Sequence, residues 1–80
     1  MLTFKAVECL LSGYVSCDVK TDVRNQSFNI NTTSHGRAIA VLENGYLMIE
    51  LLNDDTSKIV EFGTLDELYA WLCEYVPDYK

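Results

Sequence analysis

The sequence predicts an α+β fold, in which an antiparallel sheet of three to five strands carries an N-terminal and a C-terminal helix packed on one face. An Asn-Gly pair at residues 44–45 separates two apolar runs, as in a β-hairpin. A capping pattern at residues 64–67 introduces a helical repeat. A chain of 80 residues buries about 60–65% of its unfolded surface, so we expect one compact domain over residues 1–80 with little room for a deep pocket.

The first segment is predicted to form a helix over residues 3–12 that stops at Gly13. A strand is the alternative, because Leu2, Phe4 and Ala6 alternate with polar or charged neighbours. We prefer the helix because the apolar side chains recur at near-helical spacing, at Leu2, Phe4, Val7, Leu10, Leu11 and Tyr14.

The segment after Gly13 has the alternation of half-buried strands. Valine, cysteine or threonine occupies every second position from Val15 to Val23, and Phe28 and Ile30 alternate with polar neighbours. We therefore expect one strand that ends somewhere within residues 20–26 and a short second strand near residues 27–30. Residues 31–36 have the composition of a loop.

Residues 37–52 predict a hairpin with a defined register. A type I′ turn at Asn44-Gly45 pairs the residues on either side of it in order. The expected pairs are Glu43–Tyr46, Leu42–Leu47, Val41–Met48 and Ala40–Ile49. One face of the hairpin is then wholly apolar, with Ala38, Ala40, Leu42, Leu47, Ile49 and Leu51.

A second turn is expected within residues 53–57, followed by a third strand. A four-residue loop at residues 54–57 would place Leu51 opposite Val60 and Ile49 opposite Phe62, which continues the apolar face. A five-residue loop would shift every pair by one residue and bring Glu61 into the core. We prefer the first register for that reason.

The C-terminal helix is predicted from a capping box. The Thr64 oxygen can accept from the Glu67 amide, while the Glu67 side chain reaches back to the Thr64 amide. The helix is expected to run to about Val76 and to end before Pro77. Its apolar stripe comprises Leu65, Leu68, Tyr69, Leu72, Tyr75 and Val76.

The sequence holds no recognisable catalytic, cofactor or metal motif. His35 lies in a polar loop, and the spacing of Cys9, Cys17 and Cys73 contains no paired zinc ligands. We expect no enzyme, no metal and no cofactor, with Cys9 and Cys73 partly buried in helices as small apolar side chains. Three cysteines without a secretory signal indicate reduced thiols and a cytoplasmic protein.

The second face of the predicted sheet has a mixed character. It is too apolar for a face that meets only water and too acidic for a sealed core. Either the N-terminal helix or residues 14–30 cover it, or it binds a partner or a second copy of the chain. Its expected members are Ile39, Val41, Glu43, Tyr46, Met48, Glu50, Leu52, Ile59 and Glu61.

The charge is placed unevenly along the chain. Residues 1–42 hold three acidic and four basic residues, a net charge of +1, whereas residues 43–80 hold nine acidic and two basic residues, a net charge of −7. Such a protein repels nucleic acid and is steered toward a basic protein. The alternative is that the acidic residues only keep the protein in solution.

Two stretches of the sequence resemble the end of certain small phage-encoded anti-CRISPR proteins. They are Ala-Ile-Ala-Val-Leu-Glu-Asn-Gly at residues 38–45 and Glu-Phe-Gly-Thr-Leu-Asp-Glu-Leu-Tyr-Ala-Trp-Leu at residues 61–72. The resemblance covers residues 38–72 and rests on a strand, an Asn-Gly hairpin, another strand and a capped helix. It implies a stoichiometric inhibitor that occupies a basic nucleic-acid groove of a CRISPR effector in the host cytoplasm.

The leading hypothesis is therefore a small acidic protein that inhibits a nucleic-acid-binding machine by mimicking its nucleic acid. The alternative is a structural or adaptor subunit that assembles, as a homodimer or in a complex, through the apolar second face. We expect no direct contact with nucleic acid and none with a membrane. The residues predicted to bind the partner are Glu43, Tyr46, Met48, Glu50, Asp54, Asp55 and Glu61.

Overall fold

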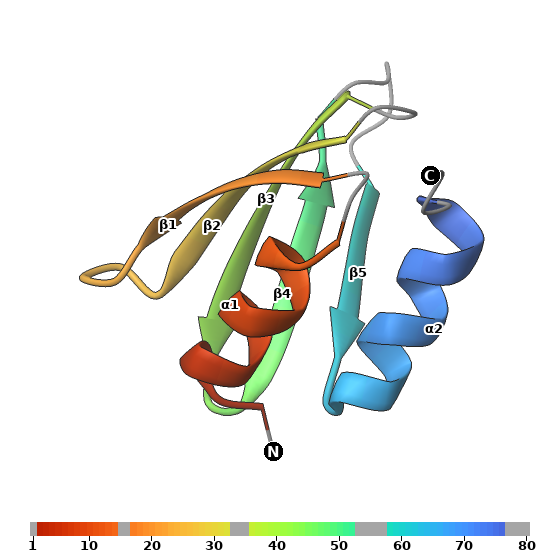
Figure 1. Cartoon of the computed structure of the whole chain (residues 1–80). Helices are drawn as coiled ribbons and strands as arrows, with labels where there is room; N and C mark the ends of the chain where they lie inside the picture. Colours follow the sequence, from red (N-terminus) through yellow and green to blue (C-terminus); the bar gives the residue numbers. More distant parts are fainter. Residues whose placement is uncertain (1, 15–16, 33–35, 53–57, 77–80) are drawn as a thin grey trace.

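A computed structural model of the chain describes residues 2–14, 17–32, 36–52 and 58–76. Its strands form one sheet in the order β1-β2-β3-β4-β5, with every neighbouring pair antiparallel (Figure 1). This confirms the predicted α+β class with two helices. The elements are α1 (Phe4–Ser12), β1 (Cys17–Asp22), β2 (Ser27–Thr32), β3 (Gly36–Glu43), β4 (Tyr46–Leu51), β5 (Lys58–Phe62) and α2 (Leu65–Tyr75).

The N-terminal segment is the predicted helix and not a strand. Thr3 caps α1, because its hydroxyl oxygen accepts from the Ala6 amide at 3.3 Å. At the other end, the Gly13 amide donates to the Cys9 carbonyl at 3.2 Å and closes the last turn. The helix turns Val7 and Leu11 fully inward.

Both helices cover the same face of the sheet, as predicted. Val7 and Leu11 of α1 share one core with Leu68 and Leu72 of α2. Figure 1 shows α1 in front of the sheet and α2 beside β5. The sheet residues of this core all point to one side: Phe28, Ile30, Ala38, Ala40, Leu47, Ile49, Leu51 and Phe62.

The β3–β4 hairpin has the predicted register. Asn44 and Gly45 have φ angles of 54° and 82°, as a type I′ turn requires. Glu43 pairs with Tyr46, and the ladder continues from there through Val41 and Met48 to Ala38 and Leu51. The predicted apolar face is buried except at Leu42, which is half-buried.

The predicted register of β5 against β4 is wrong by two residues. Ile49 pairs with Val60, and Leu51 pairs with Lys58. A shift of two residues keeps every side chain on its face, so Val60 and Phe62 still point to the core. The expected turn at residues 53–57 lies outside the described residues.

The N-terminal half adds a second hairpin to the sheet. A turn over residues 23–26 joins β1 to β2, and Asp22 Oδ1 accepts from the Asn25 amide at 3.2 Å within it. The loop predicted over residues 31–36 is too long, because β2 continues to Thr32 and β3 begins at Gly36. The strand pairing extends to these residues, where Thr32 pairs with Gly36.

The capping box of α2 is present with one change. Thr64 Oγ1 accepts from the Glu67 amide at 3.2 Å. Glu67 Oε1 accepts from the Gly63 amide at 3.2 Å and from the Thr64 hydroxyl at 3.1 Å, whereas the sequence predicted a bond to the Thr64 amide. The helix ends at Tyr75 with Val76 as its cap, close to the prediction.

Two predictions of burial in the helices are wrong. Cys9 and Cys73 are exposed, not partly buried. Leu65 and Tyr69 of the predicted apolar stripe are also exposed. Helix α2 lies beside the edge strand β5 and meets α1 on one side, so the sheet covers only part of its apolar surface.

Candidate partner-binding face

The sheet has a face opposite the helices, which we call the far face. The two sides of the β3–β4 and β4–β5 ladders alternate, so residues in register share a side. On these three strands the far face comprises the nine residues expected from the sequence: Ile39, Val41, Glu43, Tyr46, Met48, Glu50, Leu52, Ile59 and Glu61.

Acidic and apolar side chains alternate across this face. One row runs from Ile39 through Glu50 to Ile59. The next row runs from Val41 through Met48 to Glu61.

A third row pairs Glu43 with Tyr46. Each carboxylate therefore stands beside an apolar side chain on the neighbouring strand. Such spacing allows a partner to meet charge and apolar surface within the same few square nanometres.

Nothing in the described part of the chain covers the far face. Helices α1 and α2 pack on the opposite face, and β1 and β2 extend the sheet instead of crossing it. The explanation that α1 or residues 14–30 cover this surface is therefore wrong. Tyr46 is 53% exposed, Ile59 is 64% exposed and Leu52 is 39% exposed, so large apolar side chains are open to solvent.

Within the part of the chain that the structure describes, no ion pair engages Glu43, Glu50 or Glu61 of the far face. Among the described residues the ion pair found joins Lys5 to Glu8 on α1, with Nζ and Oε1 3.8 Å apart. Glu43, Glu50 and Glu61 are thus free to meet a positive charge from outside. Asp54 and Asp55, the other acids predicted to bind the partner, lie outside the described residues.

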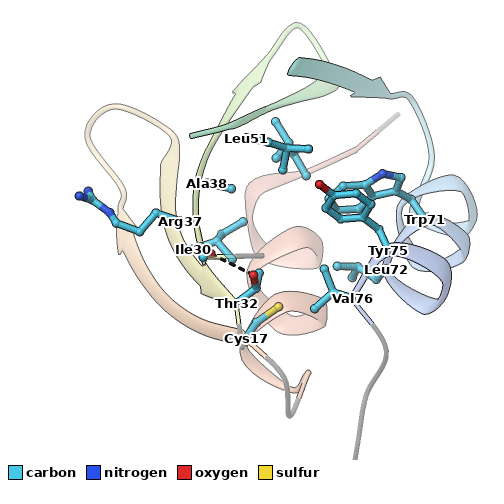
Figure 2. Close-up of a pocket in the computed structure, with 12 residues that line it drawn as sticks. Cys17, Ile30, Thr32, Arg37, Ala38, Leu51, Trp71, Leu72, Tyr75 and Val76 are labelled. Carbon is cyan, nitrogen blue, oxygen red and sulfur yellow. Dashed lines mark hydrogen bonds between the residues drawn. The ribbon is translucent and has the colours of Figure 1, made fainter. Parts of the chain in front are cut away.

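The space between α2 and the sheet is almost completely filled by side chains. A cavity between α2 and the sheet has a volume of about 10 Å³, which is roughly the smallest that holds one water molecule. Figure 2 shows the apolar side chains that line it, including Leu51, Trp71 and Val76. Within the same residues no cluster of histidine, cysteine and acidic side chains is suited to hold a metal ion.

Two aromatic side chains of α2, Trp71 and Tyr75, line this cavity. Trp71 and Tyr75 stack with ring centroids 5.0 Å apart, and Phe62 lies 5.5 Å from Trp71. The cluster fixes the C-terminal part of α2 against the sheet. The cluster therefore lies on the helix side of the sheet, opposite the far face.

Comparison of the chain with protein-family models, with curated proteins and with solved structures finds no match. No helix in the described part of the chain is long and apolar enough to cross a membrane.

The sequence reasoning missed that β1 and β2 continue the far face. Their outward side chains are polar and include Lys20, Asn29 and Asn31. The signal was present, because polar residues alternate with Cys17, Val19, Phe28 and Ile30. Their position beside Ile39 and Arg37 depends on the pairing of β2 with β3, which no local pattern specifies.

Proposed function

We propose that this protein acts by stoichiometric binding to a basic protein surface and that the far face is its contact surface. In the leading form of the proposal, the partner is a nucleic-acid-binding machine such as a CRISPR effector, which the protein inhibits in the host cytoplasm. The observation that carries the proposal is the row pattern of the far face. Carboxylates on three neighbouring strands, which form no ion pair with any described residue, alternate with exposed apolar side chains.

The two kinds of side chain serve different steps of binding. Glu43, Glu50 and Glu61 attract a positive surface from a distance and raise the association rate. Met48 in the middle row and Tyr46 at the turn end of the same surface supply apolar area and slow dissociation once water is excluded. A groove lined with lysine and arginine for phosphate groups fits this pattern, because carboxylates replace the phosphates there.

The charge of the whole chain supports a basic partner over nucleic acid itself. The net charge is −6, and a polyanion gains affinity from neutralising lysine and arginine side chains. Asp54 and Asp55 remain predicted contacts, since they lie in the sequence between β4 and β5, which carry Glu50 and Glu61. The resemblance of residues 38–72 to phage-encoded anti-CRISPR proteins points to the same class of partner.

A second candidate function is assembly of two copies through the far face. The exposure of Tyr46, Leu52 and Ile59 favours it. Two copies would, however, bring Glu43, Glu50 and Glu61 of each face into one interface, where like charges repel. Sedimentation equilibrium at low and high salt separates the two candidates: a dimer that strengthens with salt supports assembly, and a monomer at both supports the basic partner.

The proposed function is tested by capture and competition. The tagged protein is incubated with a bacterial lysate at low and high salt, and the captured proteins are identified. We expect a nucleic-acid-binding protein that is released by high salt and by excess nucleic acid. Capture that is indifferent to both, or absence of a stoichiometric partner, contradicts the proposal.

A further inference from the structure

On β1 and β2 the far face is polar and carries the basic side chain of Lys20, unlike the mixed acidic and apolar surface of β3–β5. A surface hollow of about 390 Å³ lies on β1, β2 and β3. The pairing places Asn31 between Asp18 and Arg37 in one row, and Asn29 beside Lys20 in the next. The hollow is lined by Asp18, Lys20, Asn29, Ile30, Asn31 and Arg37.

Two cations in this hollow have no carboxylate partner in the described part of the chain. The ion pair found there joins Lys5 to Glu8, far from the hollow in sequence. Lys20 and Arg37 are both exposed. Figure 2 shows the Arg37 side chain pointing away from Trp71, Tyr75 and Val76, so its guanidinium lies on the side opposite the helices. Lys20, Arg37 and Asp18 together give the hollow a net charge of +1, opposite in sign to the net charge of −6 of the whole chain.

The side chains of the hollow suit a carboxylate attached to a peptide. A guanidinium donates two parallel hydrogen bonds to a carboxylate, and an ammonium adds a second positive charge. The Asn29 and Asn31 carboxamides can each donate to and accept from the neighbouring peptide groups. A segment with one aspartate or glutamate meets both requirements.

A nucleic-acid strand suits the hollow less well. Asp18 lines the same hollow, and its two cations and one carboxylate give it a net charge of only +1. The lining contains no aromatic side chain on which a base could stack. Asp22, two residues after Lys20 on β1, and Glu50, which pairs with Ile39, lie near the hollow on the same face and would repel the next phosphates.

We propose that this hollow binds an acidic peptide segment of the partner protein, the same partner whose basic surface contacts the far face of β3–β5. The inference rests on the proposed function, since both parts of the far face then meet one partner. Arg37 and Ile39 are alternate residues of β3, and Asn29 pairs with Ile39, so the two surfaces are continuous. The partner surface then carries both signs of charge: it is basic where it contacts β3–β5 and acidic where it contacts β1–β3.

The test uses isotope-labelled protein and short synthetic peptides followed by NMR. One peptide carries a single glutamate between blocked polar residues, its match carries glutamine, and a third is an amphipathic lysine–leucine peptide. We expect the glutamate peptide to shift the Asn29 and Asn31 side-chain amides and the Arg37 Nε–H saturably, and the glutamine peptide to shift them much less. The double variant Lys20→Gln/Arg37→Gln should weaken this binding by about fivefold or more.

The matched control is Arg24→Gln/Lys58→Gln, which removes two bases outside the hollow and should bind the glutamate peptide as the wild type does. Equal shifts with the glutamate and glutamine peptides, or equal affinity of the two double variants, overturn the inference. Inorganic phosphate or a thymidine oligonucleotide that binds the hollow more tightly than the peptide also overturns it, in favour of a phosphate site.

The third peptide separates this inference from the proposed function. The lysine–leucine peptide should shift the methyl signals of Met48 on β4 and Ile59 on β5. If it does so and the glutamate peptide does not bind, the partner surface with both signs of charge is contradicted and the proposed function stands. If only the glutamate peptide binds, the hollow is supported and the basic partner is contradicted.

Discussion

The ring of Tyr46 lies directly against Gly63. A Cβ atom on Gly63 would be 3.1 Å from the Tyr46 Cε1 atom and 3.4 Å from Cδ1. The contact extends the β4–β5 ladder by one position, because Leu47 pairs with Phe62. Because Gly63 has no side chain, the exposed ring of Tyr46 can pack against its backbone on the far face.

This contact predicts coupling between the two positions. Gly63→Ala should displace the Tyr46 ring, and the cost should vanish in a Tyr46→Ala background. We expect a coupling free energy on the order of 0.5 kcal/mol in a double-mutant cycle of unfolding free energies. Additive effects of the two substitutions would show that the ring does not rest on Gly63.

The Asn44-Gly45 turn should be intolerant of a branched side chain. Gly45 has a φ of 82°, which valine adopts only with strain, so Gly45→Val should cost well over ~1 kcal/mol. The control is Asn44→Gly at the neighbouring positive φ of 54°, which should change stability by a few tenths of a kcal/mol at most. Chemical denaturation measures both, and an unchanged midpoint for Gly45→Val would contradict the turn geometry.

Thr64 should contribute to stability through its cap of α2. Its oxygen accepts from the Glu67 amide at 3.2 Å, and Thr64→Ala removes that bond at a cost of about 1 kcal/mol. Thr64→Ser keeps the hydroxyl and should be close to neutral. Thermal unfolding of the two variants provides the comparison, and an equal loss in both would mean that the hydroxyl is not the stabilising group.

Tyr14 should tie the end of α1 to α2. Its hydroxyl donates to the Leu72 carbonyl at 3.0 Å in a buried position. Tyr14→Phe should therefore cost about 1 kcal/mol, a modest value because the same carbonyl also accepts from the Val76 amide at 2.9 Å. Tyr46→Phe is the exposed control and should have almost no effect on the free energy of unfolding. If the two substitutions cost the same, the buried bond contributes nothing.

Short-range patterns in the sequence predict most of this fold. The turn at Asn44-Gly45 sets the register of β3 and β4, and the Thr64 cap sets the start of α2, because each acts within a few residues. The predicted register of β5 against β4 is wrong by two residues because no short-range signal of this kind sets it. Alternation decides which face a side chain occupies, but a shift of two residues leaves that unchanged.

The far face was only partly predictable. The nine residues on β3–β5 follow from the alternation of each strand, so they could be identified in advance. Their exposure could not, since a helix on either face fits the same pattern. The hollow around Lys20 and Arg37 depends on the pairing of distant strands, and the exposure of Leu65 and Tyr69 depends on how far α2 extends beyond the sheet.

The central claim is that the far face of β3–β5 binds the partner, and matched charge reversals test it most directly. Glu50→Lys/Glu61→Lys reverses two charges on the far face, whereas Asp66→Lys/Glu74→Lys makes the same change of net charge on exposed positions of α2. The dissociation constant for the captured partner, measured by calorimetry for both variants, decides the matter. We predict that the far-face variant binds at least about tenfold more weakly than the α2 variant. Equal affinities of the two variants, or a greater loss in the α2 variant, would contradict the claim.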